Sequence, residues 1–167
     1  VVIVGSGPTE KELQAQAVKL GLDNVIFAGY VDDATKVCLF ELSRGVVFPS
    51  YLRSEAFGVT LLEGAMYSKP LISTEVGSGT SHVNISKKTG LVVNPGSAPA
   101  LRNAMDTLWN NPDMSAFYGR EARSRYEQLF TGALMGARYT GIYQTLLNSN
   151  ADAPAANMAE NRVSQLN

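Results

Sequence analysis

Cysteine, histidine and long apolar runs are nearly absent from this sequence. Cys38 is the only cysteine among 167 residues, which excludes an intramolecular disulfide and favours a reducing compartment. His82 is the only histidine, which excludes a metal site built from several histidines. No apolar run is long enough to span a membrane. The 14 basic and 15 acidic residues nearly cancel, which argues against broad electrostatic binding to nucleic acid or to an anionic membrane.

The remaining composition is typical of one globular domain. Hydrophobic residues make up 45% of the chain, enough for a single core. Cys38 lies in the apolar part of a predicted helix, so we expect a buried thiol. The chain begins at Val1, inside an apolar run and without an initiator Met, so we expect a fragment of a longer protein.

Short apolar segments alternate with helical patterns along the chain. We expect strands over 1–4, 24–28, 45–48, 70–73 and 89–93, and helices over 9–20, 32–42, 57–67, 98–109, 112–130 and 132–147. This alternation predicts an α/β fold, a Rossmann-like parallel sheet with helices on both faces, in which 1–4 is a buried strand. We expect one domain over 1–148 and a flexible polar tail over 149–167.

Two helix starts carry cap signals. Thr9 is followed three residues later by Glu12, which predicts a capping box, and Gly21 predicts the end of that helix. Asp32 or Asp33 is suited to cap the second helix.

Four loops follow predicted strands and should open on one edge of the sheet, where such folds bind ligands. They lie at 5–7, 29–31, 49–56 and 74–80. The first carries Gly5 and Gly7 but has Glu10 where a dinucleotide fingerprint needs a third glycine, so a nicotinamide site is disfavoured. Gly7 would still let the backbone approach a ligand closely, although a plain strand-to-helix turn explains it equally well.

The most informative stretch runs from Glu55 to Glu63. It begins as a tight loop and continues as an apolar helix, with a carboxylate at each end. The N-terminus of a helix offers unpaired N–H groups and a partial positive charge, which suit a phosphate. Ionised carboxylates accept hydrogen bonds from sugar hydroxyls. A sugar, a diphosphate and a ribose bound in a row have the shape of a nucleotide-sugar.

The chain resembles the C-terminal, nucleotide-sugar-binding half of a retaining glycosyltransferase of the GT-B architecture, and more narrowly glycosyltransferase family four. That family's most specific mark is two glutamates separated by seven residues, which Glu55 and Glu63 satisfy. Five further motifs match in order: Val-Ile-Val-Gly-Ser-Gly-Pro at 2–8, Val-Ile-Phe-Ala-Gly-Tyr-Val at 25–31, Phe-Pro-Ser at 48–50, Lys-Pro-Leu-Ile-Ser at 69–73 and Thr-Gly-Leu-Val-Val at 89–93.

The resemblance implies a role for each matching residue. Glu55 would lie at the donor sugar as the candidate catalytic residue, in a positioning role, and Glu63 would accept the ribose hydroxyls. Tyr30 and Val31 would pack around the base, and Gly7 would lie under the nucleotide. Backbone N–H groups toward the sugar and diphosphate would come from Phe57, Gly58, Val59, Thr60 and Leu61.

Two departures from the family pattern matter. The Arg and Lys that clamp the diphosphate in the family would precede Val1 and are not in this sequence; Arg53 could be an extra phosphate or sugar contact or a solvent-facing side chain. The loop after the fourth strand, 77–84, is similar to that of bacterial polysaccharide-assembling enzymes, many of which use GDP-mannose.

For His82, the alternatives are an acceptor or diphosphate contact and an ordinary surface residue. The basic run Arg120, Arg123 and Arg125 is either a solvated helix face or a membrane-facing patch.

From this resemblance we expect retaining transfer from a nucleotide-sugar to a polysaccharide or lipid-linked acceptor, with an N-terminal domain as partner. We expect no cofactor, no metal and no nucleic acid, and a cytoplasmic location at or near the inner membrane face. The alternatives are a non-catalytic nucleotide-binding or scaffold domain, or an epimerase of the same architecture. A phosphorylase would need a lysine suited to pyridoxal phosphate, and a flavodoxin-like domain an acidic cluster or flavin loop; no segment suggests either.

Overall fold

The computed structural model describes residues 1–151, which form two compact units, Val1–Arg123 and the described part of Ser124–Asn167. The last helix runs to Ala151, so the first three residues of the expected tail, 149–151, are helical. The rest of that tail, 152–167, lies outside the described residues.

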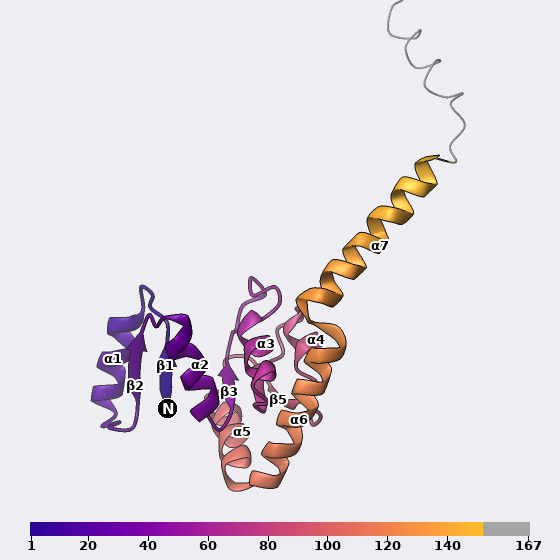
Figure 1. The fold of residues 1–167 in the computed structure, drawn as a ribbon. Coiled ribbons are helices and arrows are strands. Elements are labelled where there is room, and N and C mark those ends of the chain that lie inside the picture. Colours follow the sequence, from indigo (N-terminus) through magenta and orange to yellow (C-terminus); the bar gives the residue numbers. More distant parts are fainter. Residues whose placement is uncertain (152–167) are drawn as a thin grey trace, which may run out of the picture. The chain divides into compact units, whose positions relative to one another are not determined.

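Strands and helices alternate as predicted (Figure 1). The strands are β1 (Val2–Val4), β2 (Ile26–Gly29), β3 (Val46–Phe48), β4 (Leu71–Thr74) and β5 (Gly90–Val93). The helices are α1 (Glu10–Lys19), α2 (Asp33–Leu42), α3 (Val59–Met66), α4 (Thr80–Val83), α5 (Ala98–Asn110), α6 (Pro112–Leu129) and α7 (Gly132–Ala151). The sequence did not predict α4, a single turn within the Gly- and Ser-rich loop.

All strand pairs are parallel, which confirms the α/β class, but the described strands form two sheets instead of one. β1 pairs with β2, and β3, β4 and β5 form a three-stranded sheet in that order. In the larger sheet the register places Leu71 beside Val46 and Gly90.

β4 lies at the centre of the hydrophobic core. Its four residues are at most 4% exposed. Because side chains alternate along a strand, Leu71 and Ile72 face opposite sides of the sheet. Leu71 lies against α3 at Gly64, where an added Cβ would approach a Leu71 methyl carbon to 3.1 Å. Ile72 packs with Ala104 and Leu108 of α5 and with Tyr118 of α6. The three-stranded sheet is therefore covered on both faces, as predicted.

A buried polar network joins β4 to β5. The Asn84 amide donates to Ser73 Oγ at 2.9 Å and to the Leu91 carbonyl at 3.1 Å, and Asn84 Oδ1 accepts from Thr89 Oγ1 at 2.9 Å. Asn84, Ser73 and Thr89 are fully buried. Their hydrogen bonds replace those that water would provide, so the polar groups are tolerated in the core.

The prediction that the first strand is buried is wrong. Val2, Ile3 and Val4 are 44%, 37% and 45% exposed. In the described chain β1 pairs with β2 alone, so its other edge has no strand beside it. The expectation for Cys38 also needs correction, because its thiol is exposed on α2, a helix without a fully buried residue.

The two predicted caps behave differently. Asp32 caps α2, its Oδ1 accepting from Thr35 N at 2.7 Å. Thr9 precedes α1 but its side chain makes no cap hydrogen bond, so the expected capping box does not form. α1 ends at Lys19, and Gly21 follows its C-cap as predicted, with a φ of +64° and its N–H donating to the Val18 carbonyl.

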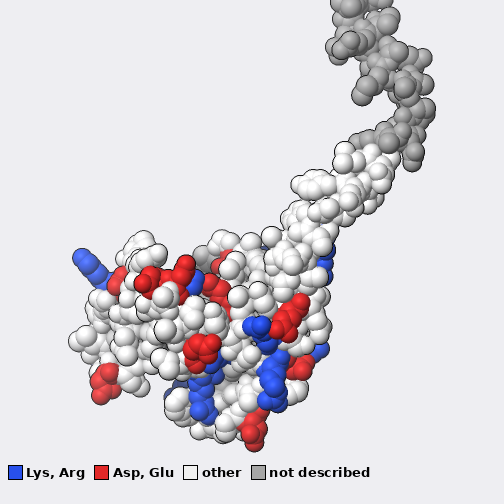
Figure 2. All heavy atoms as spheres, viewed as in Figure 1, with Lys and Arg blue, Asp and Glu red and all other residues white. Residues whose placement is uncertain are grey.

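The second unit contains the end of α6 and helix α7. Arg138 Nη1 donates to the Leu129 carbonyl at 3.1 Å, and the Arg125 guanidinium lies 5.6 Å from the centre of the Phe130 ring. α7 is almost uncharged, so it is drawn nearly white in Figure 2. Its exposed large apolar residues are Met135, Tyr139, Ile142, Tyr143, Leu146 and Leu147. No helix among residues 1–151 has both the length and the apolar character needed to cross a membrane.

Candidate functional site

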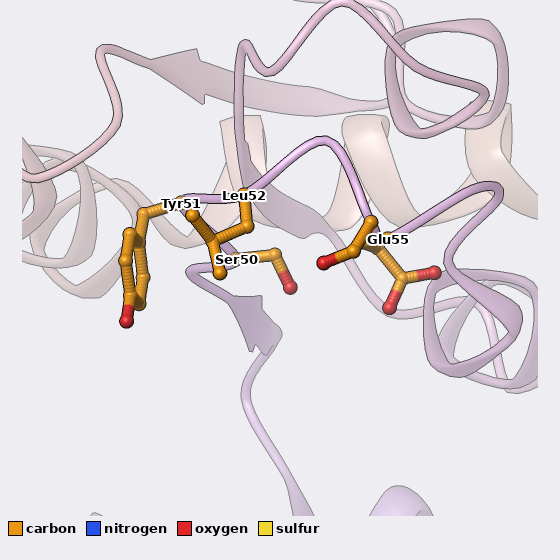
Figure 3. Close-up of a pocket in the computed structure, with 5 residues that line it drawn as sticks. Ser50, Tyr51, Leu52 and Glu55 are labelled. Atoms are coloured by element: carbon orange, nitrogen blue, oxygen red, sulfur yellow. The ribbon is translucent and has the colours of Figure 1, made fainter.

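The loops after β3 and β4 are joined to each other at the carboxyl ends of these parallel strands. Thr74 Oγ1 donates to the Ser50 carbonyl, and Gly79 N donates to the Ala56 carbonyl at 2.8 Å. This is the convergence that the sequence predicted for these two loops. A hollow opens beside them, lined by Ser50, Tyr51, Leu52, Ser54 and Glu55. Figure 3 shows the Tyr51 ring extending away from Glu55, with Ser50 between the two.

The loops after β1 and β2 are also joined. Gly5 N donates to the Gly29 carbonyl at 2.8 Å, and Gly29 has a φ of +61°, which favours glycine. Gly7 is exposed, and a Cβ added there would meet no atom within 4 Å. Tyr30 is 85% exposed and Val31 is half-buried. The backbone at Gly7 and the ring of Tyr30 are therefore accessible to a ligand.

The Glu55 carboxylate is held at the start of α3. Its Oε1 accepts from Gly58 N at 2.8 Å and from Phe57 N at 3.3 Å. These two N–H groups, which the sequence assigned to the donor, are thus engaged by the carboxylate itself. Glu55 Oε2 accepts no hydrogen bond within residues 1–151. One oxygen fixes the loop, and the other can accept a hydroxyl.

The remaining predicted donors divide into engaged and open groups. Leu61 N donates to the Gly58 carbonyl at 2.9 Å, and the Leu61 side chain is fully buried in the core. The N–H groups of Val59 and Thr60 donate to no acceptor in the described part of the chain. They are the unsatisfied donors expected in the first turn of a helix, and they are the ones available to an anion.

Gly58 is required by the fold itself. It has a φ of +84°, and an added Cβ would lie 3.0 Å from Leu61 Cδ1 and 3.2 Å from Thr80 Cγ2. The sequence suggested that a side chain at this position would crowd a ligand. The structure adds an intramolecular reason, because the left-handed backbone and the contact with α4 both disfavour any other residue.

The Glu63 carboxylate lies in an ion pair that the sequence did not reveal. Lys36 Nζ on α2 is 2.8 Å from Glu63 Oε1 and 3.2 Å from Asp33 Oδ1. The hydrogen bond with Glu63, supported by that with Asp33, raises the pKa of Lys36, which stays protonated. Glu63 Oε2 accepts no hydrogen bond within residues 1–151. Because the two partners are 27 residues apart, no local pattern could have predicted the contact.

The other candidates occupy varied positions. Arg53 is exposed, and a Cβ added at Gly77 would lie 3.9 Å from its guanidinium carbon. His82 is exposed on α4. In the basic run, Arg123 donates to the Met66 carbonyl. On the face shown in Figure 2, acidic and basic side chains are interspersed over the first unit. They do not form a patch of one sign of charge.

The described residues contain no group of three or more His, Cys, Asp or Glu side chains placed to hold a metal ion. The expectation that no metal or cofactor takes part stays a prediction.

Comparison with known proteins agrees with the motifs. The model of the family described as glycosyl transferases group 1 matches residues 1–125. O-antigen chain mannosyltransferase C of Escherichia coli is 52% identical over 151 residues, and D-rhamnosyltransferase WbpZ of Pseudomonas aeruginosa is 60% identical over 131 residues. Among solved structures, the sucrose-phosphate synthase of Thermosynechococcus elongatus has a TM-score of 0.79 at 26% identity.

These similarities extend over most of this chain but over a minority of each relative. The two bacterial relatives are matched over 90% and 78% of this chain and over 41% and 34% of their own lengths. The synthase is matched over 89% of this chain and 38% of its own. The resemblance drawn from the motifs is confirmed, and the chain belongs to the glycosyl transferases group 1 family.

Proposed function

We propose that this chain binds a nucleoside-diphosphate sugar, and that the longer protein transfers the sugar, with retention at the anomeric carbon, to a polysaccharide or lipid-linked acceptor. One observation carries the proposal. Glu55 and Glu63 each use Oε1 within the protein and leave Oε2 open, on either side of the unsatisfied N–H groups of Val59 and Thr60. Two acceptors for hydroxyls thus flank two donors for an anion.

The roles follow from this order of groups. Glu55 accepts from hydroxyls of the donor sugar, and Glu63 accepts from those of the ribose. The N–H groups of Val59 and Thr60 donate to the diphosphate at the positive end of the helix. Tyr30 and Val31, in the loop after β2, pack around the base, and the exposed backbone at Gly7 lies beneath the nucleotide.

The difficult step is the departure of the nucleoside diphosphate from an oxocarbenium-like carbon. N–H donors held in place before the reaction stabilise the charge that grows on the leaving group, without reorganising at the transition state. Basic residues outside this chain would supply the cations that the site needs. Glu55 orients the sugar, and its fixed Oε1 keeps the carboxylate from turning away.

The donor that we propose is a manno-configured sugar nucleotide such as GDP-mannose. The two bacterial relatives are named for transfer of mannose and of D-rhamnose, which is 6-deoxy-D-mannose. A site suited to both sugars would read the hydroxyls that they share. We further propose that the protein works in the cytoplasm, at the inner face of the membrane, with its acceptor held by a second domain.

Calorimetric titration with UDP, GDP and ADP tests the nucleotide site. We expect saturable binding of GDP, weakened about ten-fold or more by Glu63→Ala, because a charge-assisted hydrogen bond is lost. Glu41→Ala is the matched control: it removes an exposed carboxylate from α2 and should leave the affinity unchanged.

The titration should be made with the longer protein as well as with this chain. Binding of no nucleotide by either would overturn the proposal in favour of a scaffold domain. If the longer protein is incubated with a sugar nucleotide and forms an epimerised sugar nucleotide but no glycoside, the result would favour an epimerase. The anomeric configuration of the product, read by NMR, decides between retention and inversion.

A further inference from the structure

We propose that Lys36 is a positioning residue for the ribose of the bound nucleotide: its ammonium group fixes the Glu63 carboxylate so that Oε2 accepts the ribose hydroxyls. This inference rests on the proposed function, because it takes Glu63 as the ribose acceptor.

A hydrogen bond from Lys36 holds one oxygen of the Glu63 carboxylate. Lys36 Nζ is 2.8 Å from Glu63 Oε1 and 3.2 Å from Asp33 Oδ1. The ammonium is therefore bound by a carboxylate of its own helix, α2, and by the Glu63 carboxylate of α3. A Glu side chain without such a partner must lose rotamer freedom when its ligand binds, which weakens affinity. A carboxylate fixed beforehand loses less.

The place of Lys36 in the fold strengthens the inference. α2 begins directly after the loop that carries Tyr30 and Val31, and α3 carries Glu63. The ion pair therefore links the helix that follows the loop expected at the base to the helix expected at the ribose. A nucleoside presents both groups at a fixed separation, so a direct bond between the two elements is the contact that would preserve that spacing.

The charge of Lys36 also matters for the ligand. The ribose is bonded to the diphosphate, so a bare carboxylate at the ribose would repel the anionic part of the same ligand. The Lys36 ammonium, which Glu63 shares with Asp33, offsets part of this negative charge and leaves Glu63 Oε2 open. An uncharged hydrogen-bond donor in place of Lys36 would orient Glu63 but would not offset its charge.

A purely structural role explains the pair less well. Lys36 and Glu63 side chains are 37% and 28% exposed, and pairs that water reaches contribute little to stability. Other contacts already hold the end of α2 against the segment that follows α3. The rings of Phe40 and Tyr67 stack with centroids 5.5 Å apart, and Lys69 Nζ donates to the Glu41 carbonyl at 2.8 Å. Loss of the Lys36 ammonium should therefore affect binding more than folding.

Lys36→Met tests the proposal, because it keeps the apolar stem and removes the ammonium. The longer protein is titrated with GDP and with 2′,3′-dideoxy-GDP, and UDP with its dideoxy form in parallel. We expect the unaltered protein to prefer the ribonucleotide, and Lys36→Met to weaken its binding about five-fold or more while shrinking that preference. Lys36→Arg should restore part of the preference. Lys69→Met, the matched control, should leave it unchanged, and thermal unfolding should show that each variant is folded.

The outcomes separate the two proposals. A ribose preference that survives Lys36→Met unchanged would overturn the role of Lys36 and leave the proposed function standing. An equal loss for both forms would also overturn it, because Lys36 would then act on the diphosphate through charge alone. Failure of the unaltered protein to bind any nucleotide, or to distinguish ribose from dideoxyribose, would overturn the ribose role of Glu63 and the Lys36 proposal with it.

Discussion

β4 and β1 both pair in parallel with a neighbouring strand, yet they differ sharply in burial. β4, Leu71-Ile72-Ser73-Thr74, contains two polar residues and is at most 4% exposed. β1, Val2-Ile3-Val4, is wholly apolar, and each residue is more than a third exposed. The polar strand is the buried one because it has a strand on each side and helices on both faces. Neighbours determine burial more than the hydrophobicity of the strand itself.

The largest difference between the two strands is expected when one apolar side chain in each is shortened. Leu71→Ala should lower the free energy of unfolding by about 2–5 kcal/mol, because the side chain is fully buried against α3 and would leave a cavity. Ile3→Ala should cost less than about 1 kcal/mol, because water already reaches the side chain. Urea unfolding of the two variants measures both values. Equal losses would mean that β1 is buried in solution.

A smaller effect is expected from the polar groups that the larger sheet encloses. Asn84→Ala should lower the free energy of unfolding by about 1–3 kcal/mol, because Ser73, Thr89 and the Leu91 carbonyl lose a partner inside the core. Asn24→Ala is the control beside the smaller sheet. Its side chain is exposed, and the change should stay within about 0.5 kcal/mol. If Asn84→Ala leaves the free energy of unfolding unchanged, water enters the space that the amide leaves.

The contrast between β4 and β1 also shows which features of the fold local sequence signals predict. The alternation of apolar runs and helical patterns located each strand among residues 1–151, and Gly21 and the pair Asp32-Asp33 marked helix boundaries, because those signals are local. Whether β1 would be covered depends on partners that no local pattern specifies. The separation into two sheets, the exposure of Cys38 and the one-turn helix α4 were missed for the same reason.

The candidate site divides in the same way. The spacing of Glu55 and Glu63 identified the family. The sequence treated the five N–H groups from Phe57 to Leu61 as equivalent, whereas Glu55 and Gly58 engage three of them and leave those of Val59 and Thr60 open. The hydrogen bonds within the first turn of α3 distinguish the engaged N–H groups from the open ones. The Lys36–Glu63 pair depends on how α2 packs near α3, which is a tertiary property.

The smallest effect separates the two helix caps. Asp32→Ala should lower the melting temperature, because Thr35 N loses its acceptor, whereas Thr9→Ala should leave it nearly unchanged, because Thr9 makes no cap hydrogen bond.

Hydrogen bonds from Thr35 hold the pKa of Asp32 below its usual value, so the cap stabilises the folded state fully above that usual value. The stabilisation is lost as the pH falls through the lowered pKa. The difference between Asp32→Ala and the unaltered chain, followed by thermal unfolding, should therefore be full at neutral pH and shrink in acid. A difference that persists in acid would mean that the Asp32 side chain stabilises α2 without its charge.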